Sequence, residues 1–446
     1  MSSVTMLSNF SRTRECPAGS FGSRCRRQAG AVGGGCLVAF VLLKPSPARA
    51  QEALRDSVAG DTAVEARHIH PEALPYTFKV GDFRLLMVPS LGLDWNDNIN
   101  IVKTNALEDF ILKPRMELDA SYPVSEYNLI TLNVGAGYDQ YLEHESYSTW
   151  YLQSGSQLSF DIYVKDFWFN VHDRVDYVQD TSQQPTLSGT ATYATINNTA
   201  GLSVTWDLNK ATVSTGYDHQ DVISTTSQYD SENHASEMVF ARTGLQVRPA
   251  VTIGIEGTAA FTTYDQTVLN NNDAYTAGGY ITWQPGQYFT VQPRAGYAVY
   301  MFQHTSQSVQ TSDLHSWYAD LNVSHQFSDA MGYALDAGHE ISLGIQSDAV
   351  EDWYVRPSVH WEIIQNLSLR TSFSYENGQQ GVGNVSGNNT EYFNWFTTEV
   401  AISYPIMKKL TLSVNYRLTL RTSTVPSDEY TQNVVGIALS YRPNEL

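Results

Sequence analysis

Charged side chains recur at every second position in several stretches of this chain, and that spacing is the first pattern that could do chemistry. Between residues 110 and 122, Lys113, Arg115, Glu117 and Asp119 alternate with apolar side chains. Because alternate side chains of an extended strand point to opposite faces, the four charges would share one face. Charges along one wall can order water and select polar solutes, or they can pair across strands and neutralise each other. Both interpretations stay open here.

The same parity, applied along the whole chain, predicts a set of inward-facing charges that line a pore. Inward aromatic residues such as Trp168 and Tyr354 are too scattered to predict a sugar-binding track. The predicted pore-lining set consists of Lys113, Arg115, Glu117, Asp119, Asp161, Arg174, Asp176, Glu256, Arg294, Asp320, Asp336, Glu340, Arg356, Glu362, Arg370, Arg417 and Arg421.

Histidines are well suited to acid–base catalysis, but no catalytic motif surrounds them. The sequence contains no Gly-x-Ser-x-Gly, no His-Glu-x-x-His and no phosphate-binding loop. His172 and His360 fall on the predicted inward face and are interpreted as wall residues; a hydrolase assembled from neighbouring strands is the alternative. His68 and His70 are interpreted as part of a solvated linker rather than a metal site. We therefore expect no enzyme activity, no cofactor and no bound metal.

One short segment carries several oxygen ligands. Asp94, Asn96, Asp97 and Asn98 could together hold Ca²⁺. Asp and Asn side chains also bind nearby backbone groups and so form Asx-type turns. We favour a turn that caps the first hairpin over a calcium site.

Long strands must position these side chains. Residues 110–122 alternate apolar and polar side chains over more positions than a soluble sheet needs, and about 9–11 residues suffice for a tilted strand to cross a bilayer. Pro114 must then sit where its missing N–H is tolerated. Comparable alternation recurs in residues 150–162, 289–301, 353–363 and 410–420.

Connections alternate between short turns and long polar loops, which is typical of membrane barrels. Short turns are predicted near residues 124–125, 164–166, 208–210, 248–250, 285–287, 328–331, 365–366 and 406–408, and loops at 179–192, 219–233, 265–273, 303–313 and 376–390. Eight turns predict an antiparallel up-and-down transmembrane β-barrel of about eighteen strands, with the turns and both termini periplasmic. Sixteen strands, with a misread pair near 234–247, and a soluble propeller or solenoid are the alternatives. The sequence leaves undecided whether loops 179–192 or 376–390 fold into the barrel.

The first 50 residues are typical of a signal peptide. Arginines precede an apolar run that begins at Cys36, and Ala48-Arg49-Ala50 forms a small-x-small cleavage site. Residues 51–83 would then be a periplasmic arm, and residues 84–446 the barrel. All three cysteines lie in the leader, so the mature chain would have no disulfide and no thiolate metal site.

Composition supports a membrane barrel and excludes some partners. Charged residues make up 16% of the 446 positions, below the roughly 25% usual for soluble domains. Without the leader, 20 basic residues face 45 acidic ones, a net charge near −25. This balance argues against a nucleic-acid partner and favours cations or neutral solutes. Alternatively, many carboxylates lie on external loops and bind divalent ions of the lipopolysaccharide layer.

Two segments resemble known outer-membrane proteins. Trp95, Asp97, Asn98 and Ile99 match an aromatic-x-Asp-Asn-hydrophobic tip, and the chain resembles the putative β-barrel porin type 2 family, whose first hairpin carries that tip. The resemblance implies an outer-membrane barrel similar to those found with exopolysaccharide export systems. The C-terminal Gly436, Leu439 and Tyr441 resemble the β-signal read by the barrel-assembly machinery, although residues 442–446 follow it.

These observations predict a porin-like channel in the cell outer membrane for passive diffusion of small hydrophilic solutes, with a preference for cations. A barrel associated with exopolysaccharide export or assembly is the first alternative, and an outer-membrane hydrolase the second. Expected partners are outer-membrane lipid, lipopolysaccharide and the assembly machinery. A homotrimer stays open, although no residue pattern marks a trimer face.

Overall fold

Strands account for most of the structure. A computed structural model describes residues 75–304, 310–364, 366–384 and 390–442, which all fall in one compact unit. The predicted signal peptide and most of the predicted arm, including His68 and His70, lie outside these residues. In the described part of the chain, no helix is both long and apolar enough to span a membrane.

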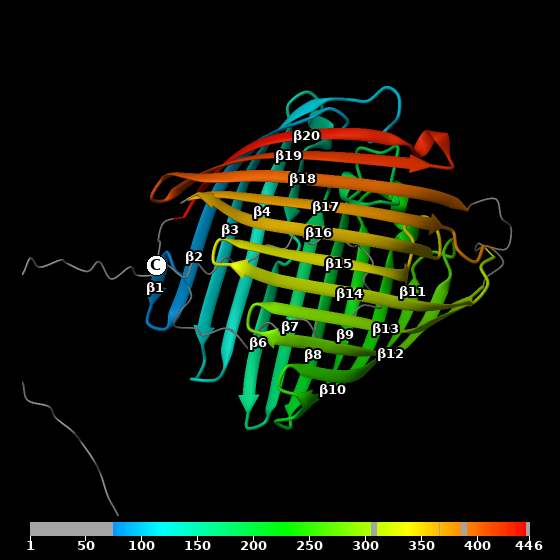
Figure 1. Cartoon of the computed structure of the whole chain (residues 1–446). Coiled ribbons are helices and arrows are strands. Elements are labelled where there is room, and N and C mark those ends of the chain that lie inside the picture. Colours follow the sequence, from blue (N-terminus) through cyan, green and yellow to red (C-terminus); the bar gives the residue numbers. More distant parts are fainter. Residues whose placement is uncertain (1–74, 305–309, 365, 385–389, 443–446) are drawn as a thin grey trace, which may run out of the picture. The chain divides into compact units, whose positions relative to one another are not determined.

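The sheet contains β1 (Phe78–Val80) and the strands of a closed barrel (Figure 1). Thr149–Leu152 (β5) and Gln157–Val164 (β6) are two halves of one barrel strand, because both pair with the strand before and the strand after them. The described residues therefore form eighteen barrel strands, as the sequence predicts. The other strands are β2 Phe83–Asn96, β3 Asp109–Pro123, β4 Leu129–Tyr141, β7 Phe167–Val178, β8 Thr195–Asp207, β9 Ala211–Ser224, β10 His234–Arg248, β11 Val251–Tyr264, β12 Asn271–Gly286, β13 Phe289–Gln303, β14 Leu314–Ser328, β15 Met331–Ser342, β16 Val350–Ile364, β17 Leu367–Gln380, β18 Glu391–Met407, β19 Leu410–Ser423 and β20 Tyr430–Tyr441.

Every barrel strand pairs antiparallel with its neighbours in sequence, and β2 pairs with β20 to close the barrel. Each of the eight predicted short turns falls where two consecutive barrel strands meet, at one end that we call the turn end; residue 365, in one of them, lies outside the described residues. Asn209 (φ 71°) and Lys165 (φ 56°) adopt the left-handed conformation that tight hairpin turns require. The longer connections lie at the opposite end, the loop end. Two predicted loops began too early, because β9 and β17 continue to Ser224 and Gln380.

Three prolines inside the barrel strands sit at interruptions of the hydrogen-bonded ladder. The β3–β4 ladder skips Pro114, between Leu112 and Arg115. The β12–β13 and β16–β17 ladders skip Pro293 and Pro357 in the same way. Since proline has no N–H to donate, these gaps are where it costs least.

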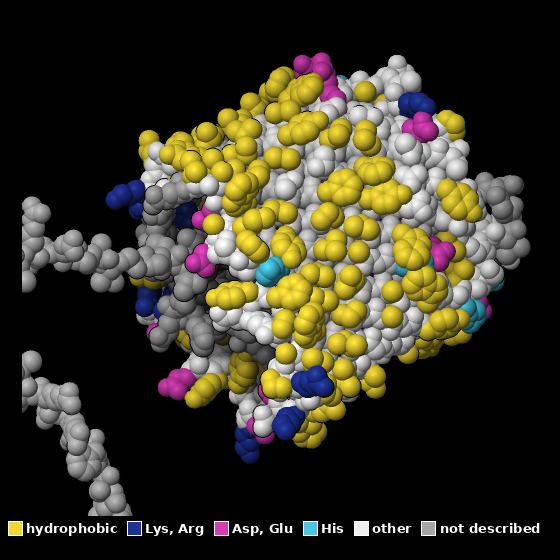
Figure 2. Space-filling view, viewed as in Figure 1, with side chains coloured by type: hydrophobic (Ala, Val, Ile, Leu, Met, Phe, Trp, Pro, Cys, Tyr) yellow, Lys and Arg dark blue, Asp and Glu magenta, His cyan; other side chains and the backbone are white. Residues whose placement is uncertain are grey.

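Apolar side chains cover the outer face of the strands (Figure 2). Aromatic groups gather toward both ends of this surface. Near the turn end, the Phe289 ring lies 5.2 Å from that of His325, and near the loop end, the Trp317 ring lies 5.3 Å from that of Trp353 (centroid distances). Such belts are typical of the two interfaces of a membrane.

Aromatic rings on the inner face lie against glycines of neighbouring strands. A Cβ atom added to Gly254 would lie 2.3 Å from Cε1 of Tyr280, and one added to Gly296 would lie 2.5 Å from Cε1 of Tyr318. The missing side chains let these rings lie against the wall. The rings therefore lie along the inner surface and do not project across the lumen.

Candidate solute pathway

The structure places all seventeen predicted charges on the inner face, where they alternate with outward-facing side chains. Along β3, for example, Lys113, Arg115, Glu117 and Asp119 point inward while Phe110 and Tyr122 are exposed on the outside. The same face carries further charges that sequence parity missed: Asp94, Asp139, Asp218, Arg242, Asp352, Glu376, Glu391 and Glu399. In β9 the outward neighbours of Asp218 are Tyr217 and His219, so no clear alternation pointed to it.

Acidic and basic side chains alternate along the inner wall of β10 to β14. Glu256 lies between two arginines, 4.0 Å from Nε of Arg242 and 4.0 Å from Nη1 of Arg294. Nε of Arg294 is 3.5 Å from Oδ1 of Asp320. Tyr318 also donates its hydroxyl to Glu256, at 3.2 Å. The charges of this wall largely neutralise one another.

The chain of contacts continues through β16 and β17. Tyr354 donates its hydroxyl to Asp320 at 2.6 Å, and its ring lies 4.3 Å from the guanidinium of Arg356. Nε of Arg356 donates to Glu376 at 2.9 Å, and its Nη1 lies 3.7 Å from Asp336. On this wall, then, acidic and basic side chains pair across strands and neutralise each other. They do not form separate acidic and basic rows.

The wall formed by β6 to β9 is different, because neutral groups hold two of its carboxylates. Asp161 accepts hydrogen bonds from Asn170 (2.7 Å) and Trp168 (3.2 Å). Asp176 accepts one from Asn197 (3.0 Å). Neutral donors stabilise an ionised carboxylate without cancelling its charge. The inward carboxylates of this wall are Asp161, Asp176 and Asp218, and Arg174 is an inward cation beside them.

A buried pair belongs to the same wall. The side chains of His172 and Asp218 are both fully buried, with Nε2 and Oδ1 3.2 Å apart. Nδ1 of His172 lies 3.0 Å from Oδ1 of Asn170. Burial between these neighbours leaves the imidazole no access to a substrate. His360 packs against Gly332 on the other wall, so the two histidines are not brought together.

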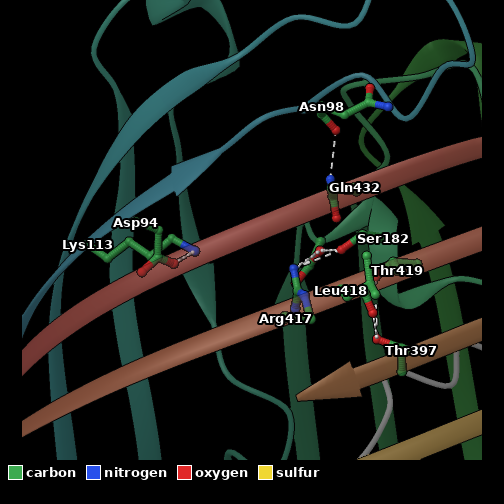
Figure 3. A network of polar contacts seen from close by, with 10 residues as sticks. Asp94, Asn98, Lys113, Ser182, Thr397, Arg417, Leu418, Thr419 and Gln432 are labelled. Carbon is green, nitrogen blue, oxygen red and sulfur yellow. Dashed lines mark hydrogen bonds and ion pairs between the residues drawn. The ribbon is translucent and has the colours of Figure 1, made fainter. Parts of the chain in front are cut away.

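The loop between β7 and β8 (residues 179–194) folds inward and reaches β19 (Figure 3). Nη1 of Arg417 donates to Asp180 at 3.0 Å, and its Nη2 donates to Ser182 at 2.9 Å. Arg421, fully buried, donates through Nε to the carbonyl of Pro185 at 2.8 Å. Two inward arginines of one strand thus anchor a loop that narrows the lumen.

Asp180 lies between cations from two strands. Burial alone would raise the pKa of its carboxyl, but the charges of Arg417 and Lys113, with the Ser182 hydroxyl, outweigh burial and lower the pKa to about 2. Lys113 is itself 2.9 Å from Asp94 of β2 (Figure 3). The loop is therefore held by a network that stays ionised over the ordinary pH range.

Several loops share one apolar cluster at the loop end. Its members come from the β2–β3, β7–β8, β9–β10 and β15–β16 loops and from the start of β20: Ile101, Leu187, Tyr193, Tyr229, Ile345 and Tyr430. The N–H of Gly189 donates to the carbonyl of Ile101 at 2.9 Å. The cluster behaves as a small core of its own and covers part of the loop end.

Buried carboxyls connect this cluster to its surroundings. Glu232 accepts a hydrogen bond from the Tyr193 hydroxyl (2.8 Å), and burial raises the pKa of Glu232 to about 7. Asp348 accepts two bonds from Asn270 (2.7 Å each) and one from the Thr311 hydroxyl. Asp348 thereby ties three loops together.

The Asp97–Asn98 tip forms a turn, as we favoured. The N–H of Asn98 donates to Oδ1 of Asn96 at 2.9 Å, and the Asp97 carboxylate accepts hydrogen bonds from Asn433 of β20. Those bonds occupy the oxygens that a calcium ion would need. Within the described ranges, no group of three or more His, Cys, Asp or Glu side chains could hold a metal ion.

The predicted β-signal lies on the closing strand. Gly436 pairs with Asp94, and Leu439 pairs with Leu91, both across the β2–β20 ladder. Tyr441 is the last residue of β20 and pairs with Leu410. Recognition by the assembly machinery remains a prediction.

Comparison with known proteins adds a family and a set of similar folds. The model of the family described as "Putative beta-barrel porin 2" matches residues 74–442. No curated protein matches the chain. Among solved structures, OccK2 (OpdF) of Pseudomonas aeruginosa, in complex with glucuronate, is 8% identical, with a TM-score of 0.45 over 80% of this chain and 98% of that one. OpdL of the same organism is 11% identical, with a TM-score of 0.45 over 81% of this chain and 99% of that one.

Proposed function

Because this chain belongs to the putative beta-barrel porin 2 family, and is an outer-membrane barrel, we propose that it is a passive channel for small hydrophilic solutes that prefers cations. An eighteen-stranded barrel leaves an aqueous lumen unless something fills it. The inward loop and the loop cluster narrow that lumen, so the channel is selective for size. The carboxylates held by neutral donors, Asp161 and Asp176, carry the preference for cations.

Ion selectivity in planar bilayers tests this proposal. We expect the reversal potential in a KCl gradient to show cation preference, and the double variant Asp161→Asn/Asp176→Asn to shift it toward zero. Asp173→Asn is the matched control, because Asp173 lies on the same strand as Asp176 but faces outward and binds Asn198. A flat current trace at high protein load, or a shift in the control as large as in the double variant, would overturn the proposal.

The proposal also holds that the chain is a channel and not an enzyme. The buried position of His172 supports this. Hydrolysis of lipids or peptides by the purified protein, lost in His172→Ala or His360→Ala, would contradict it. In the described part of the chain, no specific contact favours polysaccharide export, and the inward-folded loop 179–194 speaks against passage of a polymer. Lipopolysaccharide contact and a homotrimer remain proposals.

A further inference from the structure

The ladder that closes the barrel is short. Ser90–Asn96 of β2 pair with Val434–Ser440 of β20, which makes seven pairs. The β2–β3 ladder on the other side of the same strand has thirteen, from Arg84 to Asn96. The seam between the first and last strands therefore has about half the backbone pairing of its neighbour.

The turn end of this seam is held weakly. Beyond β20, the edge of β2 is covered by β1, where Phe78 pairs with Leu85 and the N–H of Met87 donates to the Thr77 hydroxyl at 3.0 Å. Phe78 is 54% exposed, so β1 buries little apolar surface. Pro89, one residue before the β20 pairing begins, has no N–H to offer. Among the described residues, the side-chain hydrogen bonds between the ends of these two strands lie at the loop end.

At the loop end, Asp97 and Asn433 bind each other through both backbone and side chains. The Asp97 carboxylate accepts from the N–H of Asn433 and from its Nδ2, each at 2.6 Å. The N–H of Asp97 donates to the carbonyl of Asn433 at 3.1 Å. Hydrogen bonds to an ionised acceptor are roughly twice as strong as neutral ones.

Asn98 extends these contacts by one residue. Its Nδ2 donates to the carbonyl of Thr431 at 2.9 Å, and its carbonyl accepts from Nε2 of Gln432 at 2.7 Å (Figure 3). Both Asn98 and Gln432 are buried. Ile99, the next residue, is buried in a separate apolar cluster with Ile111 and Tyr141.

We propose that the Asp97–Asn98 turn holds the barrel closed, because its contacts with Thr431, Gln432 and Asn433 join the first barrel strand, β2, to the last, β20. We call this set of contacts the closure clasp. The partners are more than 330 residues apart in sequence, so these contacts can form only after β20 has reached β2. The clasp compensates for the short ladder. This role is independent of what passes through the lumen, and it gives the first-hairpin tip an assembly function.

Hydrogen–deuterium exchange on the folded, full-length barrel in detergent tests the clasp. In Asp97→Ala we expect the amides of Leu91–Asn96 and Val434–Leu439 to exchange about ten- to hundredfold faster, because charge-assisted bonds are lost. Amides in the β3–β4 ladder should be unchanged. Unaltered exchange at the seam would overturn the proposal.

Asp109→Ala is the matched control. Asp109 is also a buried aspartate near the loop end, and its backbone pairs with Asn96 of β2. Its carboxylate, however, accepts from the N–H groups of Leu142, Glu143 and His144, which are not part of β2 or β20. We expect faster exchange near residues 142–144 but not in β20. If both variants loosen the seam equally, the clasp has no special role.

A second variant covers the case in which Asp97→Ala does not fold. Asn433→Ala keeps the Asp97 carboxylate and the backbone N–H of residue 433 but removes the side-chain donor Nδ2. We expect a smaller acceleration than in Asp97→Ala, again confined to the seam, and no additional effect when the two substitutions are combined. Fully additive effects of the two substitutions would contradict a shared clasp.

Discussion

Two inward-facing arginines of this barrel hold a loop in place in addition to lining the inner wall. Arg417 and Arg421 each reach away from their own strand and hold the 179–194 loop. A guanidinium suits this task, since it offers five donors in a fixed plane and stays charged at any ordinary pH. The position of this loop therefore depends on a few side chains.

Arg417→Ala should free the loop from β19. Each hydrogen bond between charged groups that is lost costs about 1.5–3 kcal/mol, and Asp180 would be left without its principal partner. We expect a higher and less steady single-channel conductance. Arg174→Ala is the control, because Arg174 donates to Gln157 of the neighbouring strand and holds no loop. Equal changes in the two variants would refute the anchoring role.

Gly254 shows how little space the inner wall leaves. A Cβ atom there would lie 2.1 Å from the carbonyl oxygen of Thr243 and 2.3 Å from Tyr280. We expect Gly254→Ala to destabilise the barrel by about 1–3 kcal/mol, measured as a lower denaturation midpoint. Gly257→Ala on the same strand should cost less, because its nearest atom is 3.3 Å away. A similar loss in both would contradict the packing argument.

At the scale of elements, the loops pack into one another as well as onto the strands. The cluster that contains Tyr193 and Tyr229, whose rings are 5.0 Å apart and nearly perpendicular, joins loops from distant parts of the chain. Glu232 lies beside it and is the one group of this region whose pKa is raised to about 7 in the described structure. The loop packing should therefore respond to pH.

The sign of that response follows from Glu232. Burial raises its pKa from the usual 4.5 to about 7, so the packed loops favour the neutral carboxyl. Loop packing should be strongest below pH 4.5 and weaken as the pH rises through 7. We expect conductance and protease cleavage of the loops to increase from pH 5 to 8.5, and Glu232→Gln to abolish the trend. Glu429→Gln, at an exposed pair with Lys103, should retain it.

The bond between Asp180 and Arg417 depends on pH in the opposite sense, and in a lower pH range. Its pKa is lowered from 3.8 to about 2, so the bond to Arg417 is fully present above pH 4 and is lost as the pH falls through 2. Changes between pH 5 and 8.5 therefore cannot be assigned to this anchor.

At the scale of the whole molecule, strands and turns followed from the sequence because each depends on neighbouring residues. Alternation around Lys113 and the short turns are local patterns, and they predicted eighteen strands. Contacts such as Asp180 with Arg417, or Asp97 with Asn433, join residues more than 230 positions apart, and no local pattern encodes them. The sequence accordingly predicted many of the inward-facing charges, missed others such as Asp218, and did not predict which side chains hold loops or close the seam.

The surplus of interior carboxylates predicts a salt-dependent selectivity. Charges on a wall are felt over about 10 Å at 0.1 M salt but only about 3 Å at 1 M. We expect the cation preference, measured from reversal potentials, to fall between these concentrations. Selectivity that does not change with salt would show that close contact at the narrow loop, and not the field of the wall, selects the ions.

The spacing of the two aromatic belts on the outer face also sets the thickness of membrane that the barrel spans. On β14, Trp317 of one belt and His325 of the other are eight residues apart, or about 26 Å along an extended strand. At the tilt of about 40° usual for such barrels, this corresponds to about 20 Å along the membrane normal. The protein is thus matched to a thin hydrocarbon layer, and short-chain lipids would accommodate it with less deformation of the bilayer than long-chain ones.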